Sequence, residues 1–251
     1  MLAESKFSYL CNRCGLCCRD KVITLSPYDV IRIARAAKIS TGGAIARYTL
    51  RRGSLLRFLP DRRCAALQGL RCTIHPGRPL ACRLYPLGLE RAPGAEGEYV
   101  ERFVRLEPAI GSLGVNGTAG TVAEFLDGQE IWPYLDSVAR YYALVGNFRE
   151  RVAAIVDFER VEPREFWRRA AREALAETNY DPNPLIDALF DPDGLGCGRS
   201  SSEGTAAAHV AALAQMATRE RDGALIAVAA VMLATSLGYA PGEVNAPRAI
   251  P

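Results

Sequence analysis

Seven of the eight cysteines lie within the first 82 residues, at spacings that can bring their sulfur atoms together. Two cysteines three positions apart on a turning backbone can both reach one metal ion or cluster. Disulfides need an oxidising compartment, and seven inert buried thiols at this density would be unusual. The pattern therefore predicts a metal or iron–sulfur site whose ligands come from Cys11, Cys14, Cys17, Cys18, Cys64, Cys72 and Cys82. Cys197 stands alone between two glycines and is left out of this ligand set.

The same segment resembles a known family. The stretches CNRCGLCC and CAALQGLRCTIHPGRPLACRLYP follow the pattern of the CxxCxxCC, or YkgJ-like, cysteine-cluster family, which is described as chelating zinc or iron. One member of this family is the bacterial flagellin lysine N-methylase. Resemblance to this enzyme implies an iron–sulfur cluster and S-adenosylmethionine as cofactors. The resemblance spans residues 7–90 and rests on the seven cysteines with Gly15, Ile74, His75, Arg78, Pro79, Arg83, Tyr85 and Pro86.

Seven thiolates exceed the four that one zinc ion or one cubane cluster takes. In one assignment, four cysteines hold a [4Fe–4S] cluster and three remain for a second site, redox exchange or the cluster's surroundings. In the other, the seven cysteines and His75 supply eight ligands for two zinc ions. Soft thiolates suit both metals, and the family resemblance favours the iron–sulfur assignment. His75 is alternatively an exposed loop residue or one that hydrogen-bonds a cysteine sulfur.

Two arginines flank Cys82 and are candidates for binding a cofactor. Arg78 and Arg83 could donate hydrogen bonds to cluster sulfurs or to the carboxylate of S-adenosylmethionine; the alternative is surface charge or an ion pair. Residues 1–91 contain 17 Lys and Arg against 5 Asp and Glu, whereas residues 92–251 contain 14 against 23. Cations near the cysteines would offset the charge of thiolates. Because the arginines are dispersed, nucleic-acid binding is not expected.

The rest of the sequence predicts the elements that hold this site. We expect a mainly α fold with a small irregular α+β cysteine-rich metal-binding module at the N-terminus. The module takes residues 1–91, and a mainly helical region takes residues 92–251, with a flexible linker near 191–204. Two parts are expected to be irregular: a loop to about residue 20 and a glycine-rich connection over 111–120. The patterns also predict a hairpin that turns at 68–69 and a strand over 99–106. Helices are predicted over 27–38 and 43–50, and a short helix is predicted to begin at 121. Further helices are predicted over 133–145, 148–158, 163–178, 184–190, 205–220 and 223–237.

Two classes of function remain open. No apolar run reaches the roughly 20 residues of a membrane span, and no secretion signal is visible, so we expect a cytoplasmic protein with reduced thiols and no membrane contact. In the first hypothesis it is an iron–sulfur enzyme, a lysine N-methyltransferase that acts on a protein or peptide with S-adenosylmethionine. In the second it is a non-catalytic chelator that stores or delivers zinc or iron, or stabilises a partner-binding domain. The sequence indicates no oligomeric state.

Overall fold

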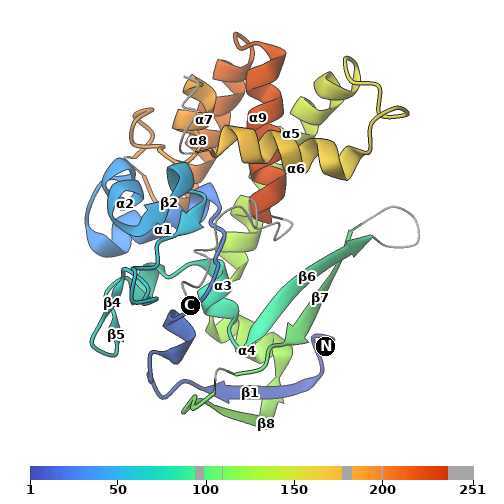
Figure 1. Ribbon diagram of the computed structural model, residues 1–251. Helices are drawn as coiled ribbons and strands as arrows, with labels where there is room; N and C mark the ends of the chain where they lie inside the picture. The colour runs from blue at the N-terminus through green and yellow to red at the C-terminus, as the bar shows by residue number, and fades with distance from the viewer. Residues whose placement is uncertain (94–98, 109, 177–182, 199, 237–251) are drawn as a thin grey trace, which may run out of the picture.

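A computed structural model describes residues 1–93, 99–108, 110–176, 183–198 and 200–236. The long helices of the second half gather at one end of the molecule, and the cysteine-bearing loops and the longer strands lie at the other (Figure 1). The predicted fold class, mainly α with a small irregular α+β module at the N-terminus, is confirmed.

Nine α-helices occur in the described part of the chain. None of them combines the length and the hydrophobicity that crossing a membrane requires. Three 3-10 turns lie at Leu16–Cys18, Arg51–Gly53 and His75–Gly77. The α-helices are α1 Pro27–Ala37, α2 Thr41–Tyr48, α3 Leu80–Leu84, α4 Val122–Gly128, α5 Trp132–Ala153, α6 Pro163–Ala174, α7 Pro184–Ala188, α8 Ser202–Ala217 and α9 Asp222–Ser236.

The prediction of two helices over 133–145 and 148–158 is wrong, because the single helix α5 runs without a break from Trp132 to Ala153. Gly146 falls between the two predicted helices and lies within α5. A single glycine costs a helix only about 1 kcal/mol relative to alanine. Val145 and Phe148 on either side are buried in the core, which holds the helix together across the glycine.

The strands form four antiparallel pairs in the described residues. The β4–β5 hairpin turns where predicted, and β7 matches the strand expected over 99–106. The pairs are β1 Lys6–Leu10 with β8 Val115–Thr121, β2 Thr49–Leu50 with β3 Leu55–Leu56, β4 Leu67–Gln68 with β5 Arg71–Cys72, and β6 Leu87–Pro93 with β7 Tyr99–Arg105.

The pairing of β1 with β8 corrects two predictions, the loop to residue 20 and the irregular connection over 111–120. The glycines of the second segment allow close approach to β1. A side chain at Gly114 would collide with the ring of Tyr9, and a Cβ at Gly117 would lie 2.7 Å from Ser8 Oγ. These glycines therefore serve strand packing.

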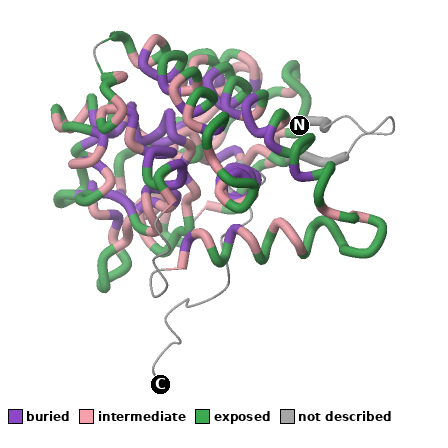
Figure 2. The backbone as a smooth tube through the Cα atoms, turned by 90° about the horizontal axis from the view of Figure 1, so that it is seen from above, coloured by how far each residue is buried: buried purple, intermediate pink, exposed green. Residues whose placement is uncertain are grey.

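Helix α1 connects the cysteine module to the helical region. Ser26 caps the helix and forms a capping box with Asp29, as the Ser-Pro start predicts. Tyr28 and Ile31 of α1 belong to the same buried cluster as Tyr141 of α5 and Val228 of α9. Buried residues lie along the inner sides of the helices (Figure 2). The two predicted domains thus share a core, and the boundary near residue 91 stays a prediction.

The beginning of the segment predicted as a flexible linker contacts α2. Thr41 Oγ1 donates a hydrogen bond of 2.5 Å to Asp191 Oδ1, and Thr41 N donates one of 2.7 Å to Asp193 Oδ2. The later residues, from Ser202, form the first turn of α8. The mobility of this segment stays a prediction.

His209 of α8 is fully buried and hydrogen-bonded on both sides of its ring. Its Nε2 lies 3.0 Å from Ala188 O and must donate, because a carbonyl oxygen can only accept. Its Nδ1 therefore accepts from Tyr141 Oη at 2.7 Å. Burial lowers the pKa of His209 to about 4. His209 is therefore a neutral residue of the core.

The buried His209 predicts acid sensitivity of the fold. Between about pH 6.5 and pH 4 the unfolded chain binds a proton at His209 that the folded chain does not. The free energy of unfolding should therefore fall by about 3 kcal/mol from this group as the pH drops through that range. Urea unfolding of the protein and of His209→Gln at several pH values measures this: their stability difference should shrink toward pH 4. A difference that stays constant from pH 7 to pH 4 would contradict the assignment.

Candidate metal centre

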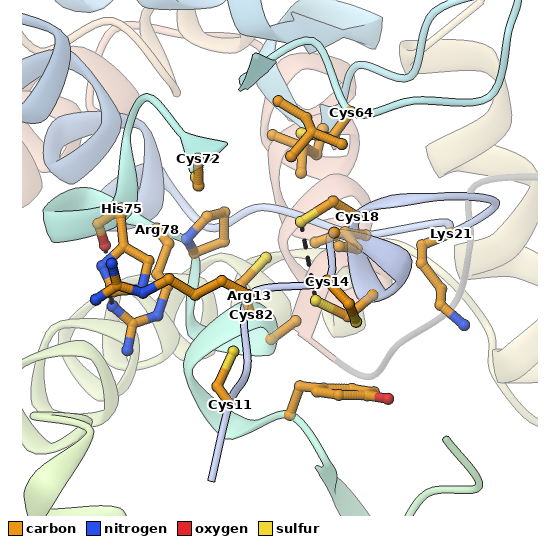
Figure 3. Close-up of a pocket in the computed structure, with 18 of the residues that line it drawn as sticks. Cys11, Arg13, Cys14, Cys18, Lys21, Cys64, Cys72, His75, Arg78 and Cys82 are labelled. Atoms are coloured by element: carbon orange, nitrogen blue, oxygen red, sulfur yellow. Dashed lines mark hydrogen bonds between the residues drawn. The ribbon is translucent and has the colours of Figure 1, made fainter. Parts of the chain in front are cut away.

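All seven N-terminal cysteines line one pocket with a volume of about 600 Å³. The labelled cysteines lie around this common space and come from several backbone segments (Figure 3). All of them are free thiols. The lining contains one carboxylate, that of Glu107, so the available donors are soft and suit zinc or iron.

The side chains are not arranged as a finished ligand set. Within the described ranges, no three His, Cys, Asp or Glu side chains are close enough together to hold one ion as they stand. A metal therefore requires the thiols to move inward from the pocket wall. The pocket accommodates such movement, because its volume of about 600 Å³ greatly exceeds that of a single ion.

The first cysteine loop is shaped by Gly15 and is held against the second cysteine segment. Gly15 has φ 73°, in the left-handed region that favours glycine. It lies next to Leu67 and Leu70 of the β4–β5 region, where a Cβ would be 3.5 Å from Leu70. Cys64 N donates a 2.9 Å hydrogen bond to Cys18 O. This bond places cysteines that are 46 positions apart in sequence side by side.

The third cysteine segment is anchored by the buried carboxylate of Asp29. Asp29 Oδ1 accepts a 2.8 Å hydrogen bond from Leu80 N, at the start of the short helix α3 that carries Cys82. Asp29 Oδ2 accepts from both N and Oγ of Ser26 at 2.7 Å. One carboxylate thus joins the first turn of α1 to the first turn of α3, and so sets where Cys82 enters the pocket.

Cys17 and Cys18 form a close thiol pair, with their Sγ atoms 3.8 Å apart. The hydrogen bond from Cys18 lowers the pKa of Cys17 to about 7, and Lys21 acts in the same direction. The same bond raises the pKa of Cys18, as do burial and the nearby thiols. Near neutral pH the two thiols can therefore share one proton. Cys17 ionises more easily than Cys18 and is the better of the two at binding a metal as thiolate.

The deeper cysteines influence one another. Burial raises the pKa of Cys64, Cys72 and Cys82, and Cys17 raises each of them further by repulsion between thiolates. Such mutual effects mark a set, the inner cysteines: Cys17, Cys18, Cys64, Cys72 and Cys82. Because Cys18, Cys64, Cys72 and Cys82 of this set resist ionisation, a bound cation would offset the repulsion between the thiolates and displace the protons of these thiols.

The remaining two pocket cysteines lie nearer to solvent. Cys11 is exposed and Cys14 is half-buried. Hydrogen bonds from the backbone of Leu113 and then of Leu16 lower the pKa of Cys14. Cys197 is not among the residues that line the pocket; its thiol lies 3.7 Å from Leu195 O. Its exclusion from the ligand set is consistent with this position.

Arg78 and His75 lie together on the pocket wall. Arg78 Nη1 donates a 2.9 Å hydrogen bond to His75 O and lies 3.4 Å from His75 Nδ1, while Nη2 donates to Gln129 Oε1 at 2.8 Å. Burial, and then Arg78, lowers the pKa of His75. The ring thus has an arginine neighbour on its Nδ1 side. Direct ligation by His75 stays one of the alternatives that the sequence left open.

Arg83 has a different position from Arg78. Its side chain is buried, it stacks over the ring of Tyr134 at 4.9 Å, and it does not line the pocket. Nη1 donates to Gln129 O at 2.7 Å, and Nη2 donates to Pro76 O at 2.5 Å. Arg83 therefore ties the chain around α3 to the residues before α5. A cofactor-binding role for it stays a prediction.

Three residues that line the pocket, Tyr9, Ser112 and Gln129, could not be assigned to the site from the sequence, whereas Tyr85 belongs to the family pattern. Tyr9 and Tyr85 line the pocket and pack edge to face, with ring centroids 5.8 Å apart. Burial, with Tyr85 and two cysteines adding to it, raises the pKa of Tyr9 to about 12. Ser112 and Gln129 line the pocket from segments that follow the cysteines. The alternation of β1 was the one signal for Tyr9, and Ser112 and Gln129 have none.

Comparison with protein families matches residues 10–102 to the CxxCxxCC family, described as "Putative zinc- or iron-chelating domain". The matched segment contains all seven pocket cysteines. No curated protein and no solved structure matches the chain significantly. Residues 10–102 of this chain are therefore similar to the cysteine-cluster domain of the CxxCxxCC family.

Proposed function

We propose that the protein binds an iron–sulfur cluster through thiolates of the cysteine pocket. The observation that carries the proposal is the lining of one pocket of about 600 Å³ by seven free cysteines and one carboxylate. Thiolate is the usual ligand of both iron–sulfur clusters and structural zinc. More than four thiols and room for a polynuclear group favour the cluster.

The inner cysteines are the proposed source of the four ligands. The Cys64 N to Cys18 O hydrogen bond fastens two of the cysteine segments to each other, and the Leu80 N to Asp29 bond fastens α3, which carries Cys82, to α1. Cys11 and Cys14 lie closer to solvent and are proposed as exchange ligands that receive or release metal. Residence in the cytoplasm would keep all of these thiols reduced.

The finer proposal is an S-adenosylmethionine-dependent methyltransferase that acts on a lysine of a protein or peptide. In that reaction the lysine nitrogen attacks the methyl carbon, the sulfonium carbon–sulfur bond breaks, S-adenosylhomocysteine leaves and the amine releases a proton. Arg78 supports this proposal because its guanidinium lines the cysteine pocket and could pair with the carboxylate of the methyl donor.

A non-catalytic chelator is the second candidate. The exposed position of Cys11 and the half-buried position of Cys14 favour it, since exposed thiols let a metal enter and leave. In this case zinc occupies the inner cysteines and the protein stores or delivers it.

Anaerobic purification followed by iron, zinc and sulfide analysis tests the metal assignment. We expect about four iron and four sulfide per chain, as one cubane contains. Cys82→Ser should lose the cluster, because it removes an inner ligand, and Cys197→Ser is the matched control that should retain it. Stoichiometric zinc without sulfide would contradict the cluster and support the chelator.

Titration of the loaded protein with S-adenosylmethionine tests the methyltransferase. Arg78→Gln should weaken binding by about tenfold or more, because it removes a charged partner of the carboxylate. Arg149→Gln, on an exposed part of α5, is the control and should bind as the unchanged protein does. Absence of binding by the loaded protein, or equal binding by Arg78→Gln, would overturn the methyltransferase while leaving the metal assignment intact.

A further inference from the structure

We propose that the mouth of the cysteine pocket docks an acidic segment of a partner protein that also presents apolar side chains. The mouth is defined by five exposed pocket-lining residues: Arg13, Lys21, Val22, Leu70 and Arg71. The use of this contact, to bring a metal or a substrate to the thiols, rests on the proposed function. The docking itself follows from the charge and the exposure of the mouth.

The charge at the opening of the pocket is unbalanced, because the exposed lining residues include three cations, Arg13, Lys21 and Arg71, and one carboxylate, that of Glu107. Arg13, Lys21 and Arg71 form no salt bridge within the described residues. Nearby cations differ: Arg62 pairs with Asp20 at 3.1 Å, and Arg63 pairs with Asp61 at 2.5 Å. The mouth therefore presents positive charge that a partner's carboxylates can neutralise, with faster and more selective association as the result.

Two large apolar side chains are sequence neighbours of these cations, Val22 next to Lys21 and Leu70 next to Arg71. Val22 is 71% exposed and Leu70 is 60% exposed. Leu113, 62% exposed, lies beside the first cysteine loop, where its carbonyl accepts a 2.7 Å hydrogen bond from Asn12 Nδ2. Exposed apolar residues gathered at the rim of a pocket indicate an interaction site more than isolated ones do. A partner that covers them must supply apolar side chains as well as acids.

The positive charge of the mouth limits which sequences around a substrate lysine can bind there. A lysine that approaches the pocket meets the three mouth cations and Arg78 behind them. Acidic neighbours in the substrate would offset this repulsion. A basic segment is therefore disfavoured as the occupant, whether the pocket supports methyl transfer or metal exchange.

Binding of defined peptides to the full chain tests the proposal. The probes are a short glutamate–leucine peptide and its counterpart in which lysine replaces every glutamate. The acidic peptide should bind, with affinity that falls as salt is added, and the basic peptide should not. The double variant Lys21→Glu/Arg71→Glu should weaken binding by about tenfold or more, because it reverses two mouth charges. Val22→Ser should weaken it through loss of apolar contact.

Matched controls separate the mouth from general charge and from folding. Arg149→Glu/Arg219→Glu changes the net charge equally at exposed positions outside the pocket, and Ile155→Ser removes an apolar side chain that is 55% exposed. Both control variants should bind the acidic peptide like the unchanged protein. Equal loss in both double variants, equal binding of both peptides, or self-association of the chain that the mouth variants abolish would overturn the proposal. Metal content, measured on the same variants, reports on the pocket separately, so loss of metal binding cannot be mistaken for loss of docking.

Discussion

The cysteine pocket depends on hydrogen bonds that fasten three separate chain segments to one another. Cys64 N donates to Cys18 O, and Leu80 N donates to the buried carboxylate of Asp29. Gly77 extends the same contact, since a side chain there would collide with the backbone of α1 at Arg32. Because α1 also packs into the helical core, the core holds the pocket wall in place. The long helices of the second half therefore serve the site without contributing a cysteine to it.

This scaffold brings together groups that repel each other when they ionise. Burial and neighbouring thiols raise the pKa of Cys64, Cys72 and Cys82, so these groups remain protonated without a cation. Fixing them close together costs conformational entropy and desolvation, and a metal ion recovers that cost by binding the deprotonated sulfurs. The hydrogen bond from Cys18 lowers the pKa of Cys17 and Lys21 adds to this effect, so one cation of the mouth also favours the thiolate of Cys17.

Local patterns predicted much of the fold. The Ser-Pro start of α1, the capping box at Thr121 and the turn at Gln68 and Gly69 appear where the sequence placed them, because each depends on residues within one turn. Pairing between distant segments could not be predicted in this way. The β1–β8 sheet joins residues more than 100 positions apart, and its glycines have low strand propensity.

The candidate site also has a part that the sequence predicted and a part that it did not. The cysteines were recognisable because their spacing is short-range and chemically distinctive. Ser112 and Gln129 lie at the pocket only because tertiary structure brings their segments there. The different positions of the two arginines also arise from tertiary structure. Arg78 and Arg83 both lie near Cys82 in the sequence, yet packing places Arg78 at the pocket and Arg83 against the main-chain carbonyls of Gln129 and Pro76.

X-ray absorption at the metal edge of the loaded protein tests the central claim most directly, because it counts the atoms bound to the metal. Ligation by the inner cysteines predicts a first shell made of sulfur at about 2.3 Å, together with an iron neighbour if the group is a cluster. A first shell dominated by nitrogen and oxygen would contradict the claim that these thiols converge on a metal.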